Sequence, residues 1–225
     1  MKILVACEES QAVTIELRKL GHEAFSCDVI ECSGGHPEWH IQADVLPLLG
    51  GKCEFKTVDG MLHNITDRWD MIIAHPPCTY LSNAGACRLY PQKGTLNKER
   101  YQKGVKAKDF FMQFYNADCE RIAIENPVSS KIFNMPLHTQ EIQPYQFGHP
   151  YTKKTRLWLK GLPNLQPTEP ITPVGPYVPA GTGRKNRSKY GSAKRGEDAK
   201  NRAKTFPGIA KAMAEQWTKE ELSRC

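Results

Sequence analysis

Two short motifs in the sequence contain side chains that could carry out covalent and acid–base chemistry. The first is His-Pro-Pro-Cys, in which Cys78 follows two prolines just beyond an apolar stretch at residues 69–74. The prolines stiffen the backbone and end sheet pairing, so the Cys78 thiol would stand at a strand end as a nucleophile. A cysteine of the hydrophobic core is the alternative, but core cysteines usually lie inside strands or helices, and Cys78 lies outside both.

The second motif, Glu-Asn-Pro, begins at Glu125 and is expected to end a strand at residues 121–124, whose residues 122–124 are apolar. A carboxylate there should be partly desolvated, which would raise its pKa toward the neutral range that a general acid or base requires. A helix-capping or salt-bridged carboxylate is the alternative. Asp28 and Asp44 also end predicted strands, where acidic residues can accept hydrogen bonds from a ribose or adenine group, although aspartate is common in ordinary turns.

Alternating strand and helix patterns predict the elements that must position these residues. Lys2–Ala6 and Glu23–Asp28 read as strands, and between them Ser10 can cap a helix that ends at Gly21. This strand–helix–strand unit, followed by a weaker strand near residues 41–44, is typical of a doubly wound parallel sheet. We therefore expect an α/β fold, with the two motifs at the carboxyl edge of its sheet, where ligands bind.

The second half of the chain predicts the elements that complete this fold. A helix is expected over residues 97–118, and a β-hairpin from residues 141–147 and Thr155–Lys160. Residues 161–183 are rich in proline and should be irregular. Apolar residues at helical spacing predict a terminal helix over Pro207–Leu222 that packs on the domain.

Composition limits the class of protein. The chain has 225 residues, 40% of them hydrophobic, which suits one globular domain, and no apolar stretch approaches the roughly 20 residues of a membrane span. The start lacks a signal-peptide pattern and the eight cysteines are scattered, so we expect a cytoplasmic protein with reduced thiols. Cys27, Cys32, His36 and His40 lack the long spacer usual between pairs of zinc ligands, and we expect no metal.

The positive charge is concentrated in one segment. Residues 181–205 carry nine Lys and Arg residues against two acidic ones, so this window accounts for the whole net charge of +7. Such a cluster favours binding to nucleic-acid phosphates, whereas a solvated loop is the alternative. Tyr177 and Tyr190 could stack on bases or simply pack in the loop. The candidate nucleic-acid-binding residues are Arg184, Lys185, Arg187, Lys189, Lys194 and Arg195.

Four stretches, in order, resemble the motifs of cytosine-C5 DNA methyltransferases. Residues 74–85 (Ala-His-Pro-Pro-Cys-Thr-Tyr-Leu-Ser-Asn-Ala-Gly) are similar to the nucleophile loop, and residues 124–127 (Ile-Glu-Asn-Pro) to the Glu-Asn-Val element. Residues 154–158 (Lys-Thr-Arg-Leu-Trp) resemble the arginine-containing strand, and residues 207–214 the closing helix. Residues 4–13 occupy the place of the first S-adenosylmethionine loop but contain no glycine. The small phage-encoded or prophage-encoded members of the family look closest.

The resemblance implies a Rossmann-like methyltransferase fold that uses S-adenosylmethionine. Cys78 would add to carbon 6 of cytosine, Glu125 would bind and protonate N3, and Arg156 would steady the base and the nucleophile loop. Pro77 and Asn126 would complete the catalytic site. The first loop would contact the methionine part of the cofactor, Asp28 its ribose and Asp44 its adenine. The residues implied to bind the cofactor are Cys7, Glu8, Glu9, Ser10, Asp28, Asp44 and Pro76.

The family's separate target-recognition domain has only a short counterpart here. A Pro/Gly-rich and basic insert, residues 161–205, would separate the two parts of the catalytic domain, residues 1–160 and 206–225. We therefore expect a DNA partner, duplex or single-stranded, that is read with little sequence specificity. Three alternatives stay open: an amino-group DNA methyltransferase, a non-catalytic nucleic-acid-binding relative, and a pyrimidine-modifying enzyme that acts on a nucleotide or a single strand.

Overall fold

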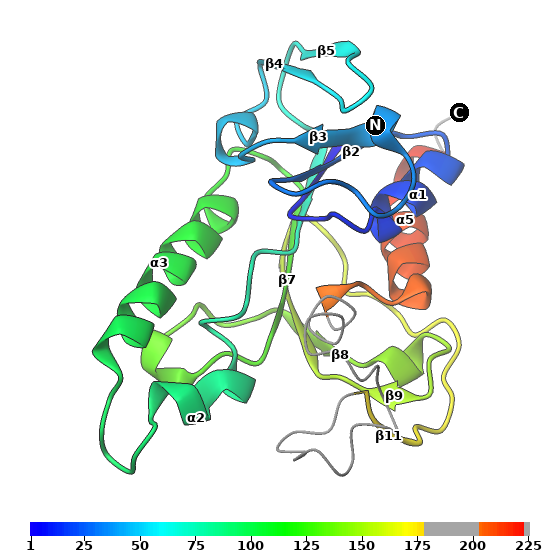
Figure 1. Ribbon diagram of the computed structural model, residues 1–225. Coiled ribbons are helices and arrows are strands. Elements are labelled where there is room, and N and C mark those ends of the chain that lie inside the picture. Colours follow the sequence, from blue (N-terminus) through cyan, green and yellow to red (C-terminus); the bar gives the residue numbers. More distant parts are fainter. Residues whose placement is uncertain (178–202, 223–225) are drawn as a thin grey trace.

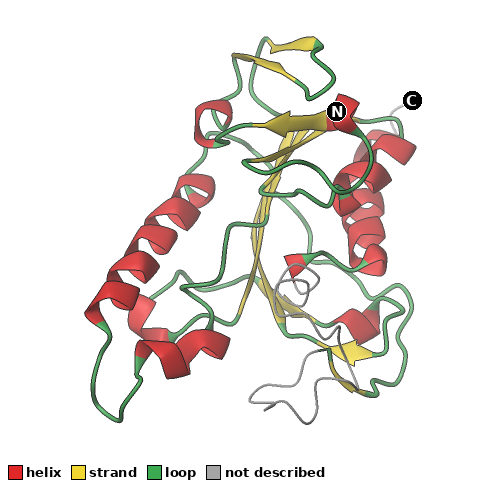
Figure 2. Ribbon diagram, viewed as in Figure 1, coloured by secondary structure: helices red, strands yellow, loops and turns green. Residues whose placement is uncertain are grey.

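The computed structural model describes residues 1–177 and 203–222, and a seven-stranded mixed sheet runs through its centre (Figures 1 and 2). The first five strands of the sheet are parallel, whereas β10 runs antiparallel to both of its neighbours, β7 and β8. The expectation of an α/β fold with a mixed sheet is confirmed, and the arrangement is compatible with a Rossmann-like fold. In spatial order the strands are β3 (His40–Gln42), β2 (Glu23–Asp28), β1 (Lys2–Ala6), β6 (Met71–Ala74), β7 (Ile122–Pro127), β10 (Thr155–Lys160) and β8 (Gln140–Ile142).

The chain reverses its winding direction at β1. From β1 it proceeds outward to β2 and β3 on one side, and it later returns to place β6 and β7 on the other side. Loops that leave two neighbouring strands in opposite directions open a crevice at the carboxyl ends of those strands. This crevice therefore lies beyond β1 and β6, where the sequence places Cys7 and His75.

Helices cover both faces of the sheet (Figure 1). Helix α3 (Lys98–Tyr115) lies on one face, whereas α1 (Ala12–Lys19) and α5 (Pro207–Leu222) lie together on the other. Because strand side chains alternate between faces, Ile72 joins the core beneath α3 and Ile73 joins the core beneath α5. The predicted terminal helix is confirmed with its bounds.

Smaller elements surround this framework. Helix α2 (Ala86–Leu89) precedes α3, and a hairpin of β4 (Cys53–Lys56) and β5 (Leu62–Ile65) packs beside the sheet. No strand was predicted for these two segments. Within residues 1–177 and 203–222, no helix combines the length and the apolar composition needed to cross a bilayer. The remaining short elements are η1 (Pro37–Trp39), η2 (Leu46–Leu48), η3 (Asn83–Gly85), η4 (Lys131–Phe133), η5 (Pro144–Gln146), β9 (Tyr151–Thr152) and β11 (Gly175–Pro176).

Several sequence-based boundaries were wrong, and two of them change the element to which residues belong. Strand β7 does not stop at residue 124 but continues to Pro127, because β10 pairs with it as far as the Thr155–Pro127 register. Glu125 is therefore part of a strand and not of a loop. The first strand of the predicted hairpin is also shorter, since β8 ends at Ile142 and a 3-10 turn at Pro144–Gln146 takes the place of its second half.

Candidate active site

The two motifs lie side by side because β6 and β7 are adjacent parallel strands. Ala74 pairs with Ile124, so the residues that follow each of them are aligned across the sheet. The amide Nδ2 of Asn126 donates a hydrogen bond of 3.1 Å to the carbonyl of Pro76. The structure thus brings the segment that carries Cys78 against the segment that carries Glu125 and Asn126.

Cys78 lies in a tight turn whose two sides are fixed by backbone hydrogen bonds. Its carbonyl oxygen accepts bonds from the amides of Leu81 (3.1 Å) and Ser82 (2.8 Å). Farther along, the amide of Asn83 donates to Val128, and Ser130 donates back to Leu81, each at 2.8 Å. The half-buried Cys78 therefore sits between two anchoring points, the Pro76–Asn126 bond before it and this short antiparallel ladder after it.

Helix α3 packs against the Cys78 turn and supports it. The guanidinium of Arg100 donates a 2.8 Å hydrogen bond to the carbonyl of Thr79 and lies 5.1 Å from the ring centre of Tyr80. Leu81 is fully buried in a small cluster with Phe133. Gly104 makes this packing possible, because a Cβ on α3 at that position would lie 2.1 Å from the ring of Phe133.

A buried pair of ionisable groups adjoins this turn. Nδ1 of His75 lies 3.2 Å from Oε2 of Glu125, and their side chains are only 8% and 14% exposed. Burial alone would lower the pKa of His75, but the hydrogen bond to Glu125 and the charges of Glu125 and Glu8 outweigh it, so the pKa of His75 is raised. The pair is therefore favoured in its charged form.

The expected rise in the pKa of Glu125 was wrong in direction. Burial does raise the pKa of this carboxyl, but the His75 hydrogen bond and the charges of Lys153 and His75 outweigh burial and lower it. Sequence reasoning missed the role of His75, although a signal was present. His75 and Glu125 both come directly after an apolar strand segment, and adjacent parallel strands place such positions together.

The buried polar atoms near the Cys78 turn that have no hydrogen-bond partner among the described residues include Nε2 of His75 and Oδ1 of Asn126. Buried polar atoms are nearly always satisfied by protein, water or ligand. The opposite ends of the same side chains are engaged, since His75 Nδ1 meets Glu125 and Asn126 Nδ2 binds Pro76. These atoms are thus available to a water molecule or a bound substrate.

Cys7, Asp28 and Asp44 meet at the neighbouring part of the same sheet edge. Burial raises the pKa of the Cys7 thiol, with further contributions from the negative charges of Asp28, Cys27 and Asp44. Each of the two aspartates caps its own turn, through the amide of Ile30 at 3.2 Å and that of Leu46 at 3.1 Å. The three residues therefore lie within electrostatic reach of one another at the ends of β1, β2 and β3.

The first loop reaches its shape without glycine. Cys7 has a φ of 58° and Gln11 a φ of 57°, the left-handed backbone region that glycine usually occupies. The buried amide of Gln11 also donates to Ser26 (3.2 Å) and to the carbonyl of His36 (2.8 Å), and the carbonyl of Glu9 accepts a 2.7 Å bond from Ser33. These bonds fasten residues 33–36 across the loop.

The carboxylate of Glu8, and not the predicted Ser10, caps helix α1. Helix α1 begins after Gln11, and the Ser10 side chain does not cap it. Instead, the buried carboxylate of Glu8 accepts bonds from the amides of Val13 (2.6 Å) and Thr14 (3.2 Å). Glu8 is therefore committed to the start of α1 and is not free to line the methionine part of a cofactor.

Arg156 lies on β10 directly opposite Asn126 of β7. Opposed residues of an antiparallel pair share a face, so Arg156 is on the same side of the sheet as Asn126. Its Nε donates a 3.0 Å hydrogen bond to Glu141, which also pairs with Lys154 at 3.2 Å. Glu141 belongs to β8, on the other side of β10 from β7, so in this structure the guanidinium is bound to the edge strand and not to Glu125 or Cys78.

The possible zinc ligands are engaged in ordinary hydrogen bonds. His40 is buried, with Nδ1 2.9 Å from the hydroxyl of Ser26 and Nε2 2.9 Å from the carbonyl of Ile30. Across residues 1–177 and 203–222, no cluster of three His, Cys, Asp or Glu side chains could hold a metal ion. The candidate nucleic-acid residues between Arg184 and Arg195, and Tyr190, lie outside the described residues.

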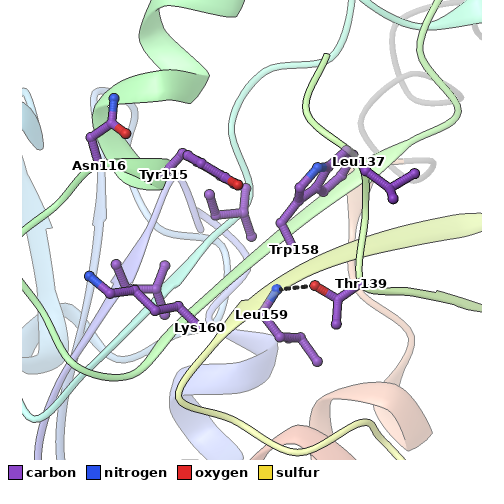
Figure 3. A pocket seen from close by; sticks show the side chains of 9 residues that line it. Tyr115, Asn116, Leu137, Thr139, Trp158, Leu159 and Lys160 are labelled. Carbon is purple, nitrogen blue, oxygen red and sulfur yellow. Dashed lines mark hydrogen bonds between the residues drawn. The ribbon is translucent and has the colours of Figure 1, made fainter.

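A cavity of about 490 Å³ lies away from these groups (Figure 3). It is lined by Tyr115 and Asn116 at the end of α3 and by Trp158 and Lys160 of β10. The Cys78 turn, by contrast, contacts Arg100 near the start of α3. The helix is 18 residues long, about 27 Å, so the cavity and Cys78 are supported by opposite ends of it.

The candidate active site thus consists of the Cys78 turn, the His75–Glu125 pair and the Cys7, Asp28 and Asp44 group, all at the carboxyl edge of one sheet. No protein-family model matches the chain, and no curated protein resembles it at a significant level. The function must therefore be inferred from the geometry and chemistry of this edge.

Proposed function

We propose that this protein is an S-adenosylmethionine-dependent methyltransferase that acts on carbon 5 of cytosine in DNA. The observation that carries the proposal is the alignment of β6 and β7, which sets the Cys78 turn beside the buried pair of His75 and Glu125. A thiol and a carboxylate held at one sheet edge suit covalent addition to a pyrimidine ring with proton transfer at its nitrogen. The methyltransferase variant of the Rossmann-like fold belongs to this proposal.

The reaction needs a covalent step because carbon 5 of cytosine is a poor nucleophile. The Cys78 thiolate forms a bond to carbon 6 while N3 takes a proton, and the electron pair moves to carbon 5, which then attacks a methyl group. Solvent water acts as the base that takes the carbon-5 proton, and the electron pair that this proton leaves behind forms the carbon 5–carbon 6 double bond as the carbon–sulfur bond breaks and restores the thiolate. N3 gives its proton back to the His75–Glu125 pair. S-adenosylmethionine, when bound, supplies the methyl group as an electrophile.

His75 resolves a difficulty in this mechanism. Glu125 has a lowered pKa and is ionised at neutral pH, so it can accept a hydrogen bond from the cytosine amino group but has no proton for N3. The ring of His75, 3.2 Å away, has a raised pKa, which favours the imidazolium form that can supply such a proton. In our proposal the proton passes from His75 through Glu125 to N3 as the thiolate adds.

The residues around Cys7 fit the cofactor. The carboxylates of Asp28 and Asp44 can accept hydrogen bonds from ribose hydroxyls and an adenine amino group. Directly after Asp28, Val29 and Ile30 are 70% and 49% exposed, an apolar surface suited to the face of a purine ring. Pro76 adjoins this group at the start of the Cys78 segment, and Glu9 and Ser10 belong to the same loop.

The decisive experiment is transfer of labelled methyl from S-adenosylmethionine to duplex DNA, single-stranded DNA and dCMP. A parallel reaction uses an oligonucleotide that contains 5-fluorocytosine, in which fluorine blocks the final elimination and traps the enzyme on the base. We expect transfer and trapping with the unchanged protein, and neither with Cys78→Ser. Cys87→Ser is the matched control, because Cys87 is an exposed cysteine of α2 in the segment that follows the turn.

Each outcome identifies one interpretation. Full methyl transfer by Cys78→Ser would exclude the covalent mechanism and favour transfer to an amino group. Salt-dependent DNA binding with neither transfer nor trapping would favour a non-catalytic binding protein. Transfer to dCMP but not to DNA would favour a nucleotide-modifying enzyme. Glu125→Gln should keep cofactor binding but lose transfer, since a neutral amide cannot relay the proton to N3.

A further inference from the structure

A second strongly basic segment lies within the part of the chain that the structure describes. Residues 86–108 contain seven Lys and Arg residues and one acidic residue, Glu99, a net charge of +6. Outside this segment and residues 181–205, the chain has fifteen basic and twenty-one acidic residues, a net of −6. The formal neutrality of the chain outside residues 181–205 therefore hides a separation of charge.

This segment is continuous with the Cys78 turn. It comprises α2, the connection at residues 90–97 and the first half of α3. Arg100 binds the carbonyl of Thr79, and the ammonium of Lys103 lies 5.8 Å from the ring centre of Tyr80. In Figure 1, α2 and the start of α3 lie together at one end of the molecule. The basic segment thus contacts the two residues that follow Cys78.

Most of the cations in this segment have no partner among the described residues. Arg88, Lys93, Lys98 and Lys106 are exposed and form no ion pair with any described side chain, whereas Lys103 pairs with Glu99 at 2.7 Å. We call these four residues the α2–α3 basic surface.

Helix stability does not explain these charges. Lys98 and Arg100 lie in the first turn of α3, where cations oppose the helix dipole. Acidic residues at that end would stabilise a solvent-exposed helix better. Clustered unpaired cations, by contrast, are stabilised when they meet the phosphates of a polyanion and release its counterions.

The spacing of the cations suits a nucleic-acid backbone. Lys98 and Lys106 are eight residues apart on α3, which is about 12 Å along its axis. One strand of a duplex has a phosphate every 3.4 Å or so of axis, so this stretch spans a few consecutive phosphates. Tyr90, 42% exposed in the connection before α3, adds an aromatic ring of the kind on which bases stack.

We infer that the α2–α3 basic surface binds the phosphate backbone of the DNA strand that presents its base to Cys78. This inference rests on the proposed function of the Cys78 site and extends it, because it makes the substrate a polynucleotide and not a free nucleotide. Backbone contacts of this kind set the position of the strand without reading its sequence.

The test compares two triple variants of equal charge. Lys93→Gln, Lys98→Gln and Lys106→Gln together remove three cations from the surface. In the control, Lys19, Lys56 and Lys211, exposed residues of α1, β4 and α5, are changed to glutamine instead. Binding of fluorescein-labelled duplex and single-stranded oligonucleotides is measured by anisotropy between about 50 and 200 mM salt.

We expect the surface variant to reduce the slope of log affinity against log salt by about 2 to 3, and to weaken binding by up to about a hundredfold near 0.1 M salt. The control variant should keep the slope of the unchanged protein. Equal slopes for the two triple variants would overturn the inference. In methyl transfer, the surface variant should raise KM for DNA and leave kcat unchanged.

The two proposals can fail separately. If the unchanged protein binds DNA through this surface but transfers no methyl group, the surface stands and the proposed function falls. If methyl transfer is robust and the surface variant binds and reacts like the control, the proposed function stands and this inference falls. Circular dichroism of both variants verifies that each is folded.

Discussion

Replacement of His75 by asparagine tests whether the buried pair with Glu125 is ionic. The asparagine amide can take the place of Nδ1 as a neutral donor, so the variant removes the charge and keeps a polar contact. A hydrogen bond to a buried charged group contributes about 1.5 to 3 kcal/mol. Because His75 is one of the groups that lower the pKa of Glu125, loss of the imidazolium should raise that pKa toward or above its ordinary value.

The pH dependence of stability distinguishes a charged pair from a neutral one. The pKa of Glu125 is lowered, so its contribution is present above its ordinary value of 4.5 and is lost as the pH falls through the folded value. The pKa of His75 is raised, so its contribution is present below 6.5 and is lost as the pH rises through the folded value. The pair therefore stabilises the protein most between these two values.

Urea unfolding of the unchanged protein and of His75→Asn provides the measurement. We expect the variant to lose about 2 to 3 kcal/mol of unfolding free energy near pH 6, and progressively less as the pH rises through the raised pKa of folded His75, above which the imidazole is neutral in both folded and unfolded protein. His138→Asn is the control, because His138 is 3.8 Å from Glu141 in a partly exposed pair and should change stability little.

A stability difference that stays constant with pH would refute the ionic pair. The imidazole signals of His75 in the unchanged protein give an independent answer by NMR, even if the variant does not fold. A His75 ring that loses its proton below pH 6.5 would contradict the raised pKa. The same result would remove the proton source that we propose for N3.

Three further predictions concern backbone and packing. Cys7→Gly should be more stable than Cys7→Ala by about 1 kcal/mol in thermal unfolding, because only glycine adopts a positive φ without strain; equal stability would show that the backbone at this position is not strained. Gly104→Ala should cost about 1 to 3 kcal/mol of unfolding free energy through contact with Phe133, and Phe133→Leu in the same chain should recover part of that loss if the clash is its cause. Glu8→Ala should lose about 1 to 2 kcal/mol as the first turn of α1 loses its carboxylate, whereas Glu16→Ala on the same helix should change stability by less than about 0.5 kcal/mol.

The bounds of a helix or strand could be predicted from the sequence where the residues of that element themselves contain the hydrophobic pattern. Lys2–Ala6, Glu23–Asp28 and Pro207–Leu222 appear with the predicted bounds, because each combines an apolar run or stripe with a clear end. The extension of β7 depends on pairing with β10, about thirty residues farther along the chain, which no local window contains. The β4–β5 hairpin has only one buried residue in each strand, so its alternation was too weak to detect.

The candidate site, too, could be predicted only in part. The positions of Cys78 and Glu125 at one sheet edge could be predicted, because strand order and direction follow from the alternating pattern. The partners of each side chain could not, since Glu8 caps a helix and His75 reverses the pKa shift of Glu125 only through contacts made in the folded state. The burial of Glu125 could be predicted from the sequence. The interactions with His75 and Lys153, which lower its pKa in spite of burial, could not.

The ladder that joins Leu81 and Asn83 to Ser130 and Val128 has a consequence for substrate capture. Ordering a flexible residue costs about 1 to 2 kcal/mol of conformational free energy. For the residues of the Cys78 turn this cost belongs to folding and is not added when a substrate binds. The Cys78 turn is thus preorganised and is not a flap that assembles around a ligand. In the reaction that we propose, the base must therefore move to a preformed turn, and the larger conformational change on binding would be that of the DNA strand.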